Sequence, residues 1–268
     1  VPCIAFINKM DRVGANFIKA VVSIDEQLSA NPVAIQMPVG SEDQFEGIVD
    51  LVTMQQFIFK DGSWGLDFEQ AELTESLRSQ AEEERHEMLE KLSLYDDDLL
   101  EKIVEEKEVG QKEIIKVLRS ATLDGQITPV LCGSAFKNKG VQQLIDSVIH
   151  YLPSPLDIPP IEGDHPVTKK LVGRDASDSA PMCALAFKVA SDPFAGQMTF
   201  VRVYSGIFES GKTSYNPRSR KNERIGNLVK LHANKREDVE KLGTGDIGAV
   251  VGMNLVTGDT LCPKEHQI

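Results

Sequence analysis

The sequence predicts an α/β domain with an α+β insertion, followed by an all-β antiparallel barrel domain. Up to about residue 162, short apolar strand patterns alternate with amphipathic helix patterns. From residue 182 to 262, apolar and polar residues alternate, and turn residues recur about every 8–12 positions, as in small barrels. The 268 residues leave room for about two domains, which we place at 1–162 and 163–268.

In the first domain, the spacing of apolar residues predicts each element in turn. The expected elements are a buried strand at 3–8, a helix at 15–29, strands at 33–39, 47–54 and 56–60, acidic helices over 69–108, a helix at 111–123, a strand at 127–133 and a helix from 140 to 152. Asp61-Gly62 is a turn signal, and Asp96, Asp97 and Asp98 are expected to form a cap or turn. The apolar face of the last helix should comprise Val141, Leu144, Ile145, Val148, Ile149 and Leu152.

Most of the sequence between the first strand and the strand at 127–133 must form a folded insertion, roughly 32–126. A simple α/β connection is much shorter than this stretch. Prolines at 153, 155, 159 and 160 predict a stiff linker after the α/β domain. In the barrel, strands are expected at 184–189, 198–205, 213–215, 225–232 and 247–251, with Asp192-Pro193 among the turns.

The most informative motif is Asn8-Lys9-Met10-Asp11, which directly follows the first apolar strand. A carboxylate such as that of Asp11 can accept paired hydrogen bonds from N1–H and the 2-amino group of guanine, and adenine offers neither donor. Asn8 can bond the purine edge and tie neighbouring loops together, while the Lys9 stem can cover a base face. The same residues are also compatible with a plain surface turn.

A second motif favours the guanine interpretation. The apolar run 129–133 leads into Ser134-Ala135, a tight turn whose backbone N–H groups could point at the guanine O6. The small side chain of Ala135 allows a close approach, and Phe136 or the Lys137 stem could cover the other face of the base. Both motifs follow strands, where open α/β sheets bind their ligands.

The sequence at 206–213 matches the phosphate-loop pattern G-x-x-x-x-G-K-[ST] letter for letter. A working phosphate loop must open a helix, whose N-terminus helps to cradle the phosphates. Here Asn216 and Pro217 follow at once, so we expect a hairpin with turns at Ser205-Gly206 and Ser210-Gly211. The alternative is a circularly permuted GTPase.

Composition narrows the class of protein further. The net charge of −12 divides into −15 over 1–162 and +3 over 163–268, which indicates different partners for the two parts. No apolar run is long enough to span a membrane, and neither the four cysteines nor the five histidines show metal-ligand spacing. Cys3 and Cys132 lie in buried-strand patterns, and scattered reduced thiols fit a cytoplasmic protein best.

Together these motifs resemble the elongation factor G family of ribosomal translocation GTPases. The resemblance covers nearly the whole chain, and its most specific parts are 6–16, 47–51, 133–142, 151–155, 192–196, 202–206 and 232–236. It implies that 1–162 is the C-terminal half of a P-loop-GTPase-type domain with the family's insertion, and that 163–268 is the second, β-barrel domain. It also implies guanine binding by Asn8, Lys9, Asp11, Ser134, Ala135 and Phe136.

For the intact protein, the resemblance implies GTP hydrolysis with Mg²⁺, coupled to tRNA–mRNA movement. The implied partners are the ribosomal stalk protein for the acidic insertion and small-subunit rRNA for the barrel. A basic cluster in the barrel could meet phosphates or could simply be solvated, and it comprises Arg218, Arg220, Lys221 and Arg224. We expect a monomer with no membrane contact.

The opening Val-Pro-Cys-Ile enters a strand at once, so we expect an internal piece of a longer protein. In that case the phosphate loop, the switch regions and the Mg²⁺ motif lie outside these residues, and the isolated chain should be inactive. A ribosomal-protection or release-factor GTPase is the alternative within the class. A non-catalytic ribosome-binding module is the alternative outside it.

Overall fold

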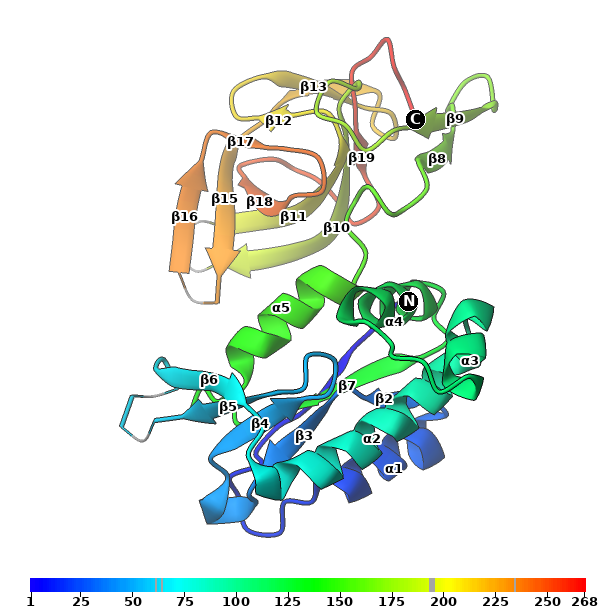
Figure 1. Ribbon diagram of the computed structural model, residues 1–268. Helices are drawn as coiled ribbons and strands as arrows, with labels where there is room; N and C mark the ends of the chain where they lie inside the picture. Colours follow the sequence, from blue (N-terminus) through cyan, green and yellow to red (C-terminus); the bar gives the residue numbers. More distant parts are fainter. Residues whose placement is uncertain (61, 64, 193–195, 234) are drawn as a thin grey trace. The chain divides into compact units, whose positions relative to one another are not determined.

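The computed structural model describes residues 1–60, 62–63, 65–192, 196–233 and 235–268 (Figure 1). The chain forms two compact units, Val1–Pro153 and Ser154–Ile268. The turn signals Asp61-Gly62 and Asp192-Pro193 fall partly outside the described residues. So do the stretches 192–196 and 232–236 that contribute to the resemblance.

A three-stranded parallel sheet lies at the centre of the first unit, in the order β1 (Ala5–Ile7), β7 (Thr128–Cys132), β2 (Pro32–Ala34). Every residue of β7 is buried, whereas β1 is only half-buried. The expectation of a buried strand over 3–8, with Cys3 inside it, is therefore wrong: Cys3 is exposed. Within the described chain β1 pairs on one side only, and an edge strand buries less surface.

A second, antiparallel sheet belongs to the insertion, in the order β3 (Gln36–Val39), β4 (Gly47–Asp50), β5 (Gln55–Phe59), β6 (Phe68–Glu72). The strand expected over 33–39 is divided at Ile35, whose N–H donates to Val130 O at 3.1 Å. Its first part joins the parallel sheet and its second part joins the antiparallel one. The helix expected from residue 69 is also wrong at its start, because pairing with β5 makes 68–72 a strand.

The helices of the first unit are α1 (Phe17–Leu28), α2 (Glu75–Ser93), α3 (Asp97–Val104), α4 (Gln111–Leu123) and α5 (Val141–Tyr151), with a 3-10 turn, η1, at Glu42–Gln44. The prediction for 111–123 is confirmed. The aspartate cap is confirmed too, because the Asp96 carboxylate accepts the Leu99 N–H at 2.9 Å and caps α3.

α5 packs only part of its predicted apolar face, at Leu144. Its buried residues are Gln143, Ser147 and Tyr151, whereas Ile145 and Ile149 are 56% and 69% exposed. The buried three are spaced at i, i+4 and i+8, and α5 packs against α4. The partners that a helix meets, not its most apolar stripe, decide which face is buried.

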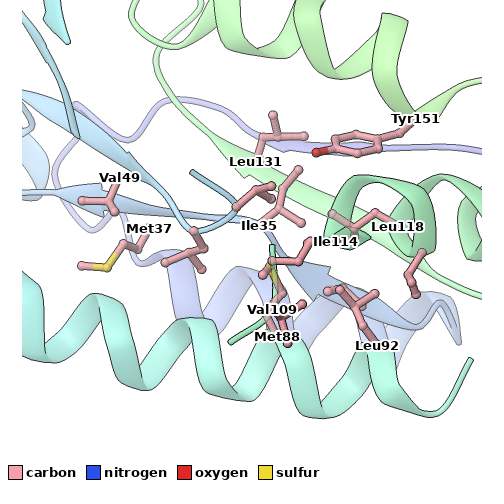
Figure 2. Close-up of a cluster of buried hydrophobic side chains, with 14 of the residues drawn as sticks. Ile35, Met37, Val49, Met88, Leu92, Val109, Ile114, Leu118, Leu131 and Tyr151 are labelled. Carbon is pink, nitrogen blue, oxygen red and sulfur yellow. The ribbon is translucent and has the colours of Figure 1, made fainter. Parts of the chain in front are cut away.

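One continuous core joins the insertion to the parallel sheet. Figure 2 shows Met88 and Leu92 of α2 lying near Ile114 and Leu118 of α4, with Leu131 of β7 beside them. All these side chains are buried. The insertion therefore shares its hydrophobic core with the sheet that bears the two motifs.

The second unit is an antiparallel β-domain whose largest sheet has the order β16-β15-β18-β11-β10-β19. The expected strands are confirmed as β10 (Cys183–Asp192), β11 (Gly196–Ser205), β13 (Thr213–Asn216), β15 (Asn227–His232) and β18 (Ile247–Val251). The sequence did not indicate the shorter strands β8 (Ile161–Asp164), β9 (Leu171–Arg174), β12 (Phe208–Glu209), β14 (Lys221–Arg224), β16 (Lys235–Val239), β17 (Lys241–Leu242) and β19 (Thr260–Leu261). Phe208, Leu228 and Leu242 lie in a core separate from that of the first unit.

Candidate functional site

The two loops that carry the motifs lie side by side, because each follows a strand of the same parallel pair. Ile7 is opposite Cys132, and backbone bonds continue the pairing beyond the strands. Gly133 N–H donates to Ile7 O at 3.0 Å, and Met10 N–H donates to Gly133 O at 3.1 Å. The carboxyl ends of β1 and β7 thus hold the segments 8–11 and 133–137 together.

Asn8 ties the two loops to each other, as its sequence position predicted. Its side-chain oxygen accepts the N–H of Ala135 at 2.9 Å and the N–H of Lys9 at 2.8 Å. Lys9 has a φ of 65°, a left-handed conformation that costs energy for a residue with a β-carbon. The Asn8 contacts offset that cost and give the tight turn its shape.

Asp11 presents an ionised carboxylate within this turn. Its side chain is 7% exposed, and Lys137 Nζ lies 3.4 Å from one carboxylate oxygen. Burial acts to raise the pKa of Asp11, but a hydrogen bond from the Ser134 side chain and the charge of Lys137 outweigh it, so the pKa is lowered. A carboxylate that is charged at neutral pH can accept two hydrogen bonds at once.

The backbone amides of the Ser-Ala turn do not point freely at a ligand, in contrast to the expectation from sequence. Ser134 N–H donates to Lys139 O at 2.9 Å, and Ala135 N–H donates to Asn8. Both donors have partners within the chain, since a tight turn satisfies its own backbone groups. Phe136 lies beside them and is 76% exposed.

Residues of the insertion hold both loops in place, and nothing in the sequence signalled this. Lys139 is buried, and its Nζ donates to Phe45 O at 2.9 Å. Glu42 accepts the Gly14 N–H at 2.7 Å and donates its own N–H to Met10 O at 3.0 Å. Long-range contacts of this kind depend on the tertiary fold, which brings η1 against both loops.

Glycines at both ends of the 133–140 loop permit this close packing. A β-carbon on Gly133 would clash with Lys139 O, and one on Gly140 would lie 2.7 Å from Cys132 O. Gly140 also has a φ of 83° and is the N-cap residue directly before α5. Any other residue at these positions would push the loop away from β7.

The phosphate-loop match at 206–213 does not open a helix. Thr213 begins strand β13, which pairs with β14. The two strands on either side of Ser210-Gly211 do not pair with each other as a hairpin. Instead, β12 pairs with β17 and β13 pairs with β14. Lys212 forms an exposed ion pair with Glu209 at 2.6 Å. Without a helix N-terminus, this segment lacks the amide cluster and dipole that hold phosphates.

The basic cluster of the second unit lies on one hairpin, and its members differ in their contacts. Arg218 forms an ion pair with Asp259, with Nη2 3.0 Å from Oδ2, and Arg224 Nε donates to Gly211 O at 3.2 Å. Arg220 and Lys221 are exposed at the tip. Arg218 is thus committed to a structural contact that the sequence did not reveal.

Two general features follow from the described part of the chain. It contains no group of three or more His, Cys, Asp or Glu side chains able to hold a metal ion. It also contains no helix that is both long enough and apolar enough to cross a bilayer.

The first unit has a parallel sheet with an Asn-Lys-x-Asp turn at its strand ends, and that turn is hydrogen-bonded to the neighbouring loop. An antiparallel β-domain follows. This combination defines the class of translational GTPase domains. Comparison with known families agrees: the family model described as Elongation factor Tu GTP binding domain matches residues 1–154. The chain belongs to that family. A second model, Elongation factor G domain 2, matches residues 181–264.

Among solved structures, the chain is similar to the crystal structure of ttk003000868 from Thermus thermophilus. The TM-score is 0.75 with 23% sequence identity, over 98% of this chain and 36% of that one. At this identity the similarity shows the fold alone. The chain spans little more than a third of that protein.

Proposed function

We propose that this chain supplies the guanine-binding half of the nucleotide site in a ribosomal GTPase of the elongation factor G type. One observation carries the proposal. The hydrogen bond from the Ala135 N–H to the Asn8 side chain holds the loops after β1 and β7 together, and the ionised Asp11 lies beside it. Membership of a GTP-binding family supports guanine as the base.

In this site each residue has a separate role toward the base. Asp11 accepts hydrogen bonds from N1–H and the 2-amino group, and Lys137 and Ser134 keep it ionised. Asn8 fixes the geometry of both loops. The Lys9 stem and the Phe136 ring cover the two faces of the base, with Ala135 leaving room at its edge.

The proposed reaction of the complete protein is hydrolysis of GTP to GDP, coupled to tRNA–mRNA movement during protein synthesis. Mg²⁺ and the phosphates require charge-stabilising groups, and the described residues show no cluster of metal ligands, so no catalytic step is assigned to this chain. Its residues bind and orient the base. A ribosomal-protection or release-factor GTPase is the second candidate, because the family match does not distinguish these activities.

We propose the same domain assignment that the sequence suggested, with 1–162 as part of the GTPase domain, an insertion near 32–126, and 163–268 as the second domain. The acidic insertion would face the basic surface of the ribosomal stalk protein. All four members of the basic cluster are exposed, and Arg220 and Lys221 at the hairpin tip are best placed to meet rRNA phosphates, since Arg218 and Arg224 already bond Asp259 and Gly211. We place this function in the cytoplasm.

The test asks whether Asp11 determines which base the protein prefers. In a protein that joins this chain to its phosphate-binding half, Asp11→Asn should weaken GTP binding by at least about tenfold, or 1.4 kcal/mol. The same variant should favour xanthosine triphosphate, because the new amide donates where xanthine has a carbonyl. Asp43→Asn, at a position of η1 outside the two loops, is the control and should change neither affinity. An unchanged GTP affinity of Asp11→Asn, measured by titration, would remove Asp11 from the site.

A further inference from the structure

The second unit contains a small cavity whose wall is mostly apolar and whose charged lining is two arginines. Its volume is about 130 Å³. Pro155, Ile158, Pro159 and Ile161 contribute to the apolar wall, and Arg174 of β9 and Arg202 of β11 contribute the charges. Every one of these residues belongs to the unit Ser154–Ile268, so the cavity does not depend on the first unit.

Both arginines have an unused donor in buried space. Arg174 donates from Nη1 to Gly173 O at 2.8 Å and from Nη2 to His266 O at 3.0 Å, but its buried Nε has no acceptor. The buried Nε of Arg202 likewise has no acceptor, and its guanidinium carbon lies 5.2 Å from the centre of the Tyr204 ring. Among the described residues, no aspartate or glutamate lines the cavity.

Both arginines carry their charge at a cavity that no acidic side chain lines among the described residues, so a bound anion would pair with them. Stacking on Tyr204 stabilises the Arg202 cation but leaves its in-plane Nε–H without a partner.

We propose that this cavity is a binding site for a small organic monocarboxylate with an apolar body. The carboxylate pairs with the charge of the Arg174 and Arg202 guanidinium groups, and the body packs against the prolines and isoleucines. A cavity of about 150 Å³ can hold benzene, so the volume suits a ligand of about the size of benzoate. Phosphate fits less well, because the apolar wall leaves its additional oxygens without donors.

The backbone at Gly245 shapes this cavity. A β-carbon there would clash with Pro155 Cγ, and the residue has a φ of 88°. Gly245 N–H donates to Val203 O at 2.7 Å, which holds the turn against β11. Only glycine lets the Pro155 ring approach this turn so closely.

The first experiment compares matched probes on the unmutated 268-residue chain. Saturable binding of benzoate should appear in NMR titrations, with amide shifts at Arg174, Arg202 and Gly245. Benzamide, which is neutral and nearly the same shape, should bind at least about tenfold more weakly, since it lacks the charge that pairs with the guanidinium groups. Inorganic phosphate should not compete with benzoate. Equal binding of benzamide, or binding of phosphate in place of benzoate, would overturn the proposal.

The second experiment removes the charge. Arg202→Met should weaken benzoate binding at least about tenfold, and Arg202→Lys should restore part of it, since the charge returns without the planar donors. Arg236→Met, an exposed arginine on β16, is the matched control and should bind as the unmutated chain does. Circular dichroism melts check that each variant folds. Unchanged benzoate affinity in a folded Arg202→Met chain would refute the assignment.

Discussion

At the scale of single residues, polar side chains in this protein act mainly by holding backbone segments in place. Asn8 is the clearest case, because one oxygen serves the N–H groups of two different segments. Lys139 does the same from a buried position, through Phe45 O. The free energy of such bonds is modest in general, about 0.5–1.5 kcal/mol each, but their loss leaves buried groups unpaired. Their effect on site geometry therefore exceeds their effect on stability.

The ion pair of Asp259 with Arg218 predicts how stability depends on pH. The hydrogen bond from Arg218 lowers the pKa of Asp259, although burial of the carboxyl opposes this. The folded chain thus binds this proton less tightly than the unfolded chain. The resulting stabilisation is fully present above the unfolded pKa, near about 4, and is lost as the pH falls through the lower folded value.

Asp259→Asn should therefore lower the Tm of the second unit at pH 7 and have a smaller effect at acid pH, as the pH falls through the lowered folded pKa and the carboxylate of the unmutated chain is itself protonated. Calorimetric melts across this pH range measure the difference. Asp238→Asn, on exposed β16, serves as the control and should show little effect at either pH. A Tm difference that stayed constant with pH would show that packing, not charge, accounts for the loss.

At the scale of elements, the ends of helices follow local chemistry and their faces follow tertiary contacts. α3 begins at Asp96 because that carboxylate satisfies the free N–H of Leu99. The fully buried Leu99 then anchors the same turn in the core. α5 shows the opposite situation, since contacts with α4 bury a face that its composition did not indicate.

Removing the side chain that caps α3 should lower the stability of the first unit. Asp96→Ala should reduce the free energy of unfolding of the first unit by about 0.5–2 kcal/mol, because the Leu99 N–H loses its acceptor. Asp97→Ala changes the same charge one residue later, where the capping bond of α3 is not made. Urea denaturation of both variants separates capping from simple charge. Equal losses in the two would contradict a specific capping role for Asp96.

At the scale of the whole molecule, each of the two units has its own hydrophobic core. The first unit builds one core from insertion and sheet, so the insertion helps to fix the loops of the candidate site. The second unit has its own core around Phe208 and Leu242. It therefore has the means to hold its own binding surfaces, including the two-arginine cavity.

The isolated 268-residue chain should hydrolyse no GTP and bind GDP very weakly. Catalysis of phosphoryl transfer depends almost wholly on positioning and charge stabilisation at the phosphates. Base contacts from Asp11, Lys9 and Phe136 must alone offset the lost freedom of the ligand, which costs several kcal/mol. Calorimetry with GDP and a phosphate-release assay measure both properties. Micromolar binding or measurable turnover would mean that the phosphate site lies within these residues.

Local pattern and motif chemistry were enough to predict much of the fold and part of the site. The helix at 111–123, the Asp96 cap and the main strands of the second unit follow from periodicity and capping residues, which act over a few positions. The proximity of Asn8 to Ala135 followed from two strand-loop motifs, since parallel strands bring their carboxyl ends to one edge. The rejection of 206–213 as a phosphate loop followed from the proline and asparagine after it.

Only the tertiary structure decided the rest. The division of 33–39 between two sheets, the strand at 68–72 and the buried face of α5 all depend on partners distant in sequence. So do the Lys139–Phe45 contact, the Arg218–Asp259 pair and the cavity with two unpaired arginine donors. The physical reason is the same in each case. A side chain's type sets which interactions it can make, but burial and pairing are properties of the space that the whole fold encloses.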